Sequence, residues 1–210
     1  MIKQRLKKYI PKSLVYHIRG VRDLIRWNFI GRPIPPPYYY KRTQIQKYAR
    51  KFNLQNFVET GTWHGETVYH LINSFDKIIS IEIGEDHYQN AKKRFVSYKH
   101  IQILKGDSGV LLPSIVKNID KPVIYWLDGH YMQGMREKGE LNTPIIRELS
   151  CIFDKKLKGN VILIDDARDF TGSYDYPTID ILRKFVLSVD QNVDFEVYSD
   201  IIRITPKLPK

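Results

Sequence analysis

From about residue 53 onward, short apolar runs alternate with longer segments of helical periodicity, and this alternation limits the possible folds more than any other feature. The apolar runs lie at Phe57-Val58, 78–83, 101–104, 123–127, 161–164, 195–198 and 201–204. Helical patterns lie between them, over 67–73, 87–98, 109–116, 144–153 and 178–187. Such alternation is typical of an α/β fold in which helices cover both faces of a parallel sheet. The last two runs are close enough to form an antiparallel hairpin.

The N-terminal part of the chain differs from the rest in charge. Residues 1–52 contain 14 Lys or Arg against one acidic residue, a balance of +13, whereas residues 53–210 carry −2. The net charge of +11 therefore belongs to an extension, and we expect no nucleic-acid partner for the core. We divide the chain into a basic helix with a proline-rich linker at 1–40 and an α/β domain at 41–210.

Within the extension, residues 13–29 have the pattern of an amphipathic basic helix. The apolar positions alternate with arginines and are Leu14, Ile18, Val21 and Ile25. Such a helix can lie on an anionic membrane, cover the domain or mediate homodimer contacts, and the sequence leaves all three open. Four prolines in 31–37 predict an extended linker, and a short helix is expected over 43–52.

Cysteine content and hydropathy bear on the compartment. The single Cys151 excludes an intramolecular disulfide framework, and no run of about 18 apolar residues exists. The N-terminus carries charges where a signal peptide has its apolar stretch. We therefore expect a cytoplasmic protein, with peripheral contact to the inner membrane surface through residues 1–30 as an alternative.

A glycine-rich turn follows the first apolar run. Glu59, Gly61 and Gly65 form an acid-x-Gly-x-x-x-Gly pattern that also contains Thr62 and His64. Glycine lets a ligand approach the backbone, and amides at the start of a helix supply hydrogen-bond donors. The G-x-G-x-x-G pattern of dinucleotide sites is absent, which disfavours a nicotinamide oxidoreductase. The turn predicts a different nucleoside ligand, although a tight structural turn has the same composition.

Acidic residues at the ends of the next two runs extend this candidate site. Glu82, followed by Ile83, lies about 20 residues after the turn, where nucleoside-binding folds place an acid against ribose hydroxyls. Asp107 and Ser108 follow the third run. Asp107 can accept a hydrogen bond from an adenine amino group or cap the next helix, and Glu82 can also be a solvated strand end.

These motifs resemble those of the class I S-adenosylmethionine-dependent methyltransferases over about residues 53–206. The resemblance implies a Rossmann-like three-layer sandwich with a mostly parallel seven-stranded sheet and a C-terminal antiparallel hairpin. It also implies that S-adenosylmethionine is the methyl donor. The implied contacts are Glu59, Gly61 and Gly65 for its methionine part, Glu82 for the ribose, Asp107 and Ser108 for the adenine, with Thr62, His64 and Ile83 shaping the site.

Two further segments narrow the resemblance. Residues 126–131 and 164–168 are similar to those of small bacterial methyltransferases linked to surface-glycan or secondary-metabolite pathways. We therefore expect methyl transfer to a hydroxyl of a carbohydrate or another small molecule. The alternative is a non-catalytic protein that binds a membrane surface or a partner through its basic helix, because a fold alone does not establish function.

Three carboxylates follow the fourth and fifth runs, at Asp128, Asp165 and Asp166. Oxygen ligands of this kind suit Mg²⁺. The arrangement resembles metal-dependent catechol-type O-methyltransferases, but those have an Asp-Asn pair where this chain has two aspartates. In the alternative, Asp128 orients the ammonium of the donor while the others cap loops or bind Arg168. The departure from Asp-Asn favours transfer without a metal.

Methyl transfer is an in-line displacement in which the protein aligns donor and acceptor and removes the acceptor's proton. His130 titrates near neutral pH and is the best-placed base, and we expect it to be catalytic together with Asp128. A structural hydrogen-bond role beside Asp128 is the competing interpretation. The polar loop 132–140 is a candidate lid over the acceptor.

Overall fold

Seven strands form one sheet, with bounds close to the predicted runs. The computed structural model describes residues 12–129 and 139–208. The strands are β1 (Asn56–Thr60), β2 (Lys77–Glu82), β3 (Ile101–Lys105), β4 (Val123–Leu127), β5 (Val161–Ile164), β6 (Val193–Tyr198) and β7 (Ile201–Pro206). Their order is β3-β2-β1-β4-β5-β7-β6, and only β7 pairs antiparallel with its neighbours β5 and β6. The predicted parallel sheet with a C-terminal hairpin is confirmed.

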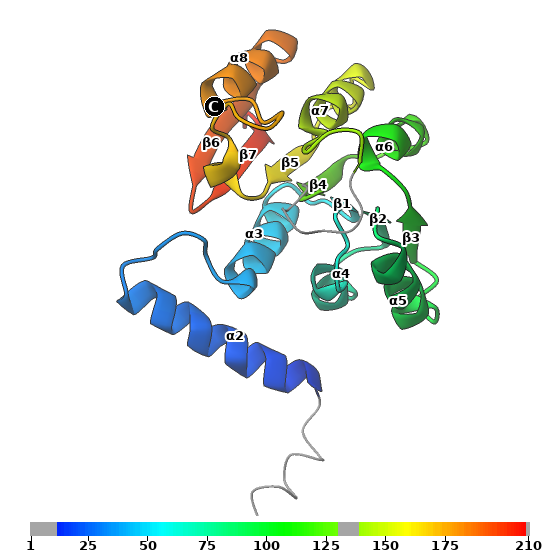
Figure 1. Ribbon diagram of the computed structural model, residues 1–210, viewed down its shortest axis with the longest axis vertical. Coiled ribbons are helices and arrows are strands. Elements are labelled where there is room, and N and C mark those ends of the chain that lie inside the picture. The colour runs from blue at the N-terminus through cyan, green and yellow to red at the C-terminus, as the bar shows by residue number, and fades with distance from the viewer. Residues whose placement is uncertain (1–11, 130–138, 209–210) are drawn as a thin grey trace, which may run out of the picture.

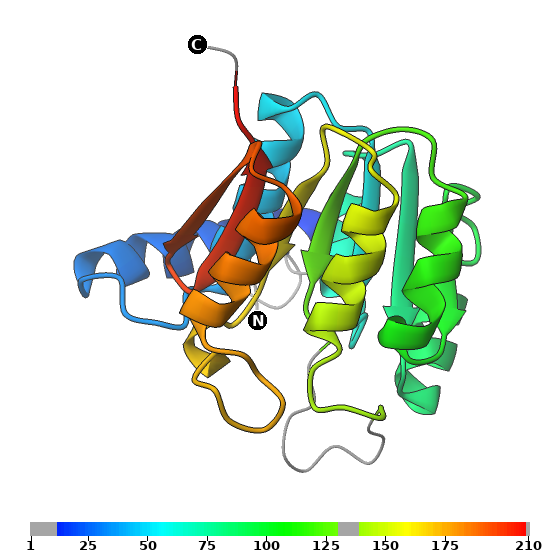
Figure 2. The same ribbon diagram turned by 90° about the horizontal axis from the view of Figure 1, so that it is seen from above.

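Helices cover both faces of the sheet, as Figures 1 and 2 show. One layer contains α3 (Tyr38–Lys51), α4 (Glu66–Leu71) and α5 (Glu85–Phe95). The other contains α6 (Ser108–Lys117), α7 (Ile145–Asp154) and α8 (Ile179–Val189). A short 3-10 helix, Ala167–Asp169, follows β5. The molecule is the expected three-layer α/β sandwich.

The apolar runs are continuous because both faces of the central strands are buried. On β4, Ile124 and Trp126 pack in the core beneath α3 and α4, whereas Tyr125 and Leu127 pack in the core beneath α6 and α7. All five residues of β4 are buried. Side chains of a strand alternate between its two faces, so a strand covered on both sides needs apolar residues at every position.

The strand order places a ligand crevice between β1 and β4. These two strands pair in parallel, but the chain continues from β1 toward β2 and from β4 toward β5, in opposite directions across the sheet. In open α/β sheets, ligands bind beyond the carboxyl ends of the strands where the order reverses in this way. The glycine turn and Asp128 both follow this pair of strands.

The two N-terminal helices pack against one another, and the second begins earlier than predicted. Helix α3 begins at Tyr38, directly after Pro37, rather than at Thr43. Helix α2 (Lys12–Phe29) lies beside α3 (Figure 1). Gly20 and Trp27 of α2 are buried, whereas Ile18 and Ile25 of the predicted apolar stripe are exposed. Its buried Trp27 packs on Tyr40, with ring centroids 4.8 Å apart. None of the described helices is long and apolar enough to cross a membrane.

Candidate functional site

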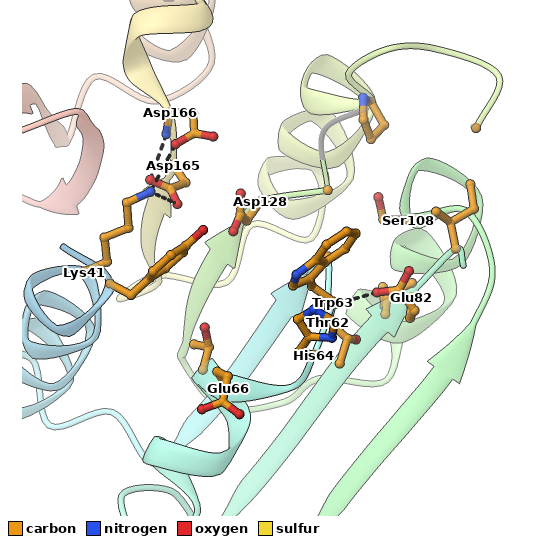
Figure 3. A pocket seen from close by; sticks show the side chains of 18 of the residues that line it. Lys41, Thr62, Trp63, His64, Glu66, Glu82, Ser108, Asp128, Asp165 and Asp166 are labelled. Carbon is orange, nitrogen blue, oxygen red and sulfur yellow. Dashed lines mark hydrogen bonds and ion pairs between the residues drawn. The ribbon is translucent and has the colours of Figure 1, made fainter. Parts of the chain in front are cut away.

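A cavity of about 390 Å³ opens at the carboxyl ends of the central strands (Figure 3). Its walls come from the glycine turn, from the residues that follow β2, β3, β4 and β5, and from α3 with the linker before it. The volume lies within the range of about 300–1,000 Å³ typical of small-molecule sites. Of the predicted site residues within the described ranges, Gly61, Thr62, His64, Glu82, Ile83, Asp107, Ser108, Asp128, Asp165 and Asp166 line it.

The glycine turn lies tightly against the end of β4. Gly61 has a φ of +85°, and a Cβ atom added there would lie 2.4 Å from the carbonyl oxygen of Asp128. Gly65 has a φ of +70°, precedes α4, and has the Phe95 ring 2.8 Å from the position of a Cβ. Both positions therefore require glycine for backbone reasons, and the close approach of β1 to β4 brings the turn to the cavity wall.

Glu82 is held at the cavity by two backbone amides. Its Oε1 accepts a hydrogen bond from the Gly84 amide at 2.7 Å, and its Oε2 accepts one from the Trp63 amide at 2.6 Å (Figure 3). The residue is only 5% exposed. Because each carboxylate oxygen has more than one acceptor site, both oxygens can still receive hydroxyl groups from a ligand. The carboxylate is thus a fixed acceptor pair.

Glu59 lies beneath the turn and, like Gly65, is not among the residues that line the cavity. Ser80 Oγ donates to Glu59 Oε2 at 2.6 Å, and Ser80 Oγ lies 2.6 Å from Thr62 Oγ1. Burial raises the pKa of Glu59 to about 8, although hydrogen bonds from Ser80 and Thr67 oppose the shift. Glu59 therefore supports the turn through a buried hydrogen-bond chain, and its direct contact with a ligand stays a prediction.

Asp107 caps α6 at the third strand end. Its Oδ1 accepts from the Gly109 amide at 2.8 Å, and its Oδ2 accepts from the Glu140 amide at 3.2 Å. The capping role weighed as the alternative is therefore present. Asp107 and the buried Ser108 nevertheless line the cavity, so an additional contact to an adenine group remains a prediction.

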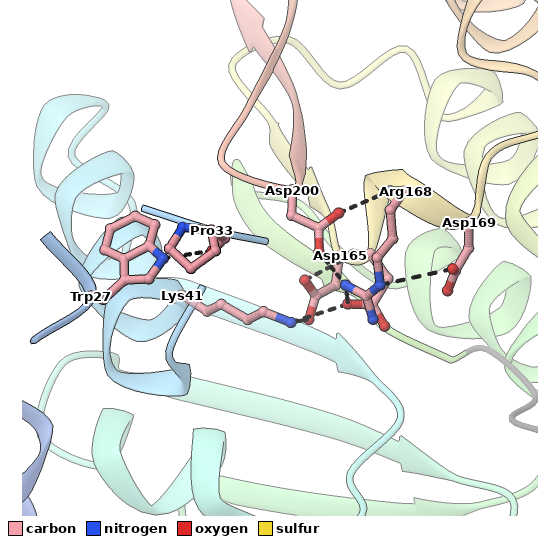
Figure 4. Close-up of polar contacts among 8 residues, drawn as sticks. Trp27, Pro33, Lys41, Asp165, Arg168, Asp169 and Asp200 are labelled. Carbon is pink, nitrogen blue, oxygen red and sulfur yellow. Dashed lines mark hydrogen bonds and ion pairs between the residues drawn. The ribbon is translucent and has the colours of Figure 1, made fainter. Parts of the chain in front are cut away.

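The opposite end of the cavity is acidic. Asp128 follows β4, Asp165 and Asp166 follow β5, and one carboxylate oxygen of each lies within 4.8 Å of the others. Lys41 of α3 reaches into this group (Figures 3 and 4). Its Nζ donates to Asp165 Oδ2 at 2.6 Å and to Asp166 Oδ1 at 3.1 Å. The predicted convergence of the three aspartates is present, but the lysine was not predicted.

Burial and mutual charge shift the protonation of this group. Burial works to lower the pKa of Lys41, but attraction by Asp165, Asp166 and Asp128 outweighs it, so the pKa is raised and the ammonium stays charged. Burial and repulsion by Asp166 raise the pKa of Asp165 to about 7 against the attraction of Lys41. Burial and repulsion by Asp165 and Asp166 also raise the pKa of Asp128. One ammonium does not fully compensate three carboxylates.

Arg168 connects this acidic end to the turn between β6 and β7. Its Nη1 donates to Asp166 Oδ1 at 3.0 Å and forms an ion pair with the buried Asp200 (Figure 4). The Arg168 amide donates to Asp200 Oδ1 at 2.9 Å. Asp166 therefore binds Arg168, as the alternative to a metal site anticipated, and the same oxygen also accepts from Lys41.

The residues at the acidic end do not fit a Mg²⁺ site as they stand. Mg²⁺ requires carboxylate oxygens at about 2.0–2.1 Å in near-octahedral geometry. Here oxygens of Asp165 and Asp166 already accept hydrogen bonds from Lys41, and Asp166 accepts a second one from Arg168. A divalent ion at these oxygens would lie close to two fixed positive charges, which repel it.

Sequence reasoning missed several cavity residues that come from remote segments. Lys41 and Arg42 lie on α3, Tyr38 begins that helix, and Trp63 lies in the glycine turn. The buried Nε of Arg42 has no hydrogen-bond partner among the described residues. Only Trp63 had a local signal, its place inside the turn. His130 lies outside the described residues, and so do residues 132–138 of the candidate lid.

Three solved structures with the same architecture carry methyltransferase names. The O-methyltransferase TomG from Streptomyces achromogenes, solved with S-adenosylmethionine, matches with a TM-score of 0.60 at 13% identity, covering 94% of this chain and 90% of that one. An O-methyltransferase from Bacillus cereus, solved with S-adenosylhomocysteine, matches with a TM-score of 0.58 at 15% identity, covering 97% and 96%.

A putative caffeoyl-CoA O-methyltransferase from Staphylococcus aureus matches with a TM-score of 0.55 at 16% identity, covering 97% of this chain and 96% of that one. No protein-family model and no curated protein sequence matches this chain. At these identities the likeness shows the fold, which is the Rossmann-like fold of the methyltransferases.

Proposed function

We propose that this protein is an S-adenosylmethionine-dependent O-methyltransferase that acts on a hydroxyl of a small molecule. The observation that carries the proposal is the cavity itself, which joins a nucleoside-type wall to an acidic wall at the point where the strand order reverses. Gly61 and the fixed carboxylate of Glu82 belong to the first wall, and Asp128 adjoins both. The fold of the structural neighbours supports the same activity.

The donor would lie along the first wall. Glu82 offers two carboxylate oxygens to the ribose hydroxyls, and the region of Asp107 and Ser108 takes the adenine. The methionine part would lie near Gly61. Arg42 also lines the cavity, and its unsatisfied Nε–H group suits the donor's carboxylate.

The acceptor would lie at the acidic wall. Carboxylates of Asp128, Asp165 and Asp166 accept hydrogen bonds from hydroxyl groups, so this wall suits a carbohydrate or a similar polyhydroxylated molecule. The acceptor oxygen forms a bond to the methyl carbon as the carbon–sulfur bond breaks, and its proton passes to a base. We propose His130 as that base, with Asp128 orienting the hydroxyl.

Calorimetry with S-adenosylmethionine, S-adenosylhomocysteine and NAD⁺ tests the donor class. We expect the first two to bind with a stoichiometry of one and NAD⁺ not to bind, because the turn lacks the glycine spacing that accommodates a pyrophosphate. Binding of NAD⁺ in preference to the sulfonium donor would contradict the proposal. Mass spectrometry of a panel of sugars incubated with enzyme and donor would then identify the acceptor.

We also propose that the protein works in the cytoplasm, at the anionic surface of the inner membrane, and that α2 attaches it there. Ile25 and Phe29 are 52% and 86% exposed, and Ile18 on the same helix face is also exposed. Exposed arginines at positions 19 and 26 lie beside this stripe, and Arg22 lies within it. An apolar stripe with neighbouring arginines suits the interface of an anionic membrane.

Cosedimentation with phosphatidylglycerol and phosphatidylcholine vesicles tests this placement. We expect the full chain to bind the anionic vesicles and the variant Ile25→Asp/Phe29→Asp to lose most of that binding. Val96→Asp is the matched control, because Val96 is equally exposed but lies far from α2 in the sequence. Equal sedimentation of all three proteins would refute membrane attachment. If the wild type is a dimer that the double substitution disrupts, the exposed stripe would instead be the contact surface between two copies of the chain.

A further inference from the structure

The acidic end of the cavity contains a buried positive charge that belongs to the protein itself. Lys41 Nζ lies 2.6 Å from Asp165 and 3.1 Å from Asp166, and the lysine side chain is only 8% exposed. Both aspartates belong to the set of three carboxylates whose oxygens converge. We infer that Lys41 is the resident cation of this cluster and takes the place of the divalent metal that three carboxylates would otherwise attract.

The position of Lys41 is fixed by the packing of its helix. Ile45, Tyr48 and Ala49 bury one face of α3 in the core between the helix and the sheet. The Lys41 side chain therefore starts from a rigid element. Its ammonium lies 5.5 Å from the centroid of the Tyr38 ring and is bound by two carboxylates. A buried charge that loses its partners is strongly destabilising, so the ammonium does not readily leave.

The ammonium also binds two of the carboxylate oxygens that a metal could use. Asp166 Oδ1 accepts from Lys41 and from Arg168 at the same time, and Asp165 Oδ2 accepts from Lys41. A divalent ion that bound here would have to displace these hydrogen bonds. It would also face repulsion from two nearby cations in a site largely shielded from water.

For the reaction, this inference rests on the proposed methyl transfer. An ammonium has three N–H donors, and the two aspartates accept from two directions, which leaves a donor for a ligand in the cavity that Lys41 lines. A hydrogen bond from this donor to the acceptor oxygen would position one of the oxygen's lone pairs toward the methyl group. Lys41 would thus orient the acceptor by a fixed charge of the protein.

Electron paramagnetic resonance with Mn²⁺ tests the inference without any methyl transfer. We expect the full-length wild type to leave Mn²⁺ free in solution. Lys41→Met removes the ammonium but keeps the apolar stem, so it should bind Mn²⁺ at least tenfold more tightly than the wild type. Adding Asp165→Asn to Lys41→Met should abolish the gain. Lys47→Met is the matched control, because it removes an exposed lysine of the same helix and should leave Mn²⁺ free.

Tight Mn²⁺ binding by the wild type that Asp165→Asn abolishes would overturn the inference, since it would mean that Lys41 yields to a metal. The comparison of the wild type with Asp165→Asn tests the inference even if Lys41→Met does not fold. Failure of folded Lys41→Met to gain Mn²⁺ binding would also overturn it. Lys41→Arg retains the charge and should bind no Mn²⁺. Calorimetry with S-adenosylhomocysteine on the same variants reports separately on the proposed function, because the donor wall is intact in all of them.

Discussion

The two ends of the cavity are built in different ways. The donor end comes from residues near strand ends that follow one another closely along the chain, and backbone amides fix its central carboxylate, Glu82. The acceptor end joins Lys41 to Asp166 across 125 positions and adds Arg168, which the β6–β7 turn holds through Asp200. A backbone-built site leaves a local sequence pattern, whereas one built from remote side chains leaves none.

The two ends should also have separate functions, donor binding at one and the methyl-transfer step at the other. Changes at the donor end should alter affinity for the donor, and changes at the acceptor end should alter turnover with donor affinity preserved. Asp128 is the junction, because its carbonyl abuts Gly61 while its carboxylate faces Asp165 and Asp166. Three predictions test whether the two ends are independent.

The largest effect is expected for the proposed base. His130→Ala should lower turnover by about 10²–10⁴-fold, the usual contribution of general base catalysis, with donor affinity nearly unchanged. Rates with the identified acceptor, and calorimetry with S-adenosylhomocysteine, measure the two quantities. Turnover should survive EDTA. Activity that disappears with EDTA and returns with Mg²⁺ would contradict both the base assignment and the inference that Lys41 is the resident cation of the acceptor end.

A smaller effect is expected at the donor end. Glu82→Ala should weaken donor binding by about 1.5–3 kcal/mol, because it removes hydrogen bonds to a charged group. Calorimetry with S-adenosylhomocysteine measures the change. Glu85→Ala, on the adjacent and more exposed acid, is the control and should leave affinity unaltered. Unchanged affinity in Glu82→Ala would contradict the assignment of Glu82 to the ribose. It would also contradict the functional distinction between the two ends of the cavity.

The smallest effect concerns the support beneath the donor turn. Because the pKa of Glu59 is raised from about 4.5 to about 8 on folding, the folded state holds a proton there that the unfolded state loses. The contribution of Glu59 to the unfolding free energy should therefore fall as pH rises between these values, by up to about 1.4 kcal/mol per pH unit. Between pH 5 and pH 6, the unfolding free energy of Glu59→Gln should therefore decrease by about 1 kcal/mol less than that of the wild type.

Urea denaturation at several pH values measures that slope. Glu85→Gln is again the control, since its side chain is about half exposed and should leave the slope unaltered. Parallel profiles for Glu59→Gln and the wild type would show that Glu59 is ionised in the folded protein. The donor turn would then rest on a buried charge, like the acceptor end.

Several features followed from the sequence alone. The parallel sheet, the helices on both faces and the C-terminal hairpin follow from short continuous apolar runs, typical of strands buried on both faces, that alternate with segments of 3.6-residue periodicity. The glycine turn and Glu82 could be placed because strand ends of a parallel sheet share one edge. Gly61 and Gly65 marked this turn in the sequence, and the structure gives both a positive φ that other residues rarely adopt.

The tertiary structure decided what no local pattern encodes. Pairing of Lys41 with Asp165 depends on how α3 packs over the sheet, and from the sequence Lys41 is one of 14 basic residues within residues 1–52. The face that α2 turns to the domain depends likewise on the fit of Gly20 and Trp27 against tyrosines of α3, which leaves Ile18 and Ile25 of the predicted apolar stripe exposed. Both are contacts between side chains of separate elements, and periodicity within one element carries no information about them.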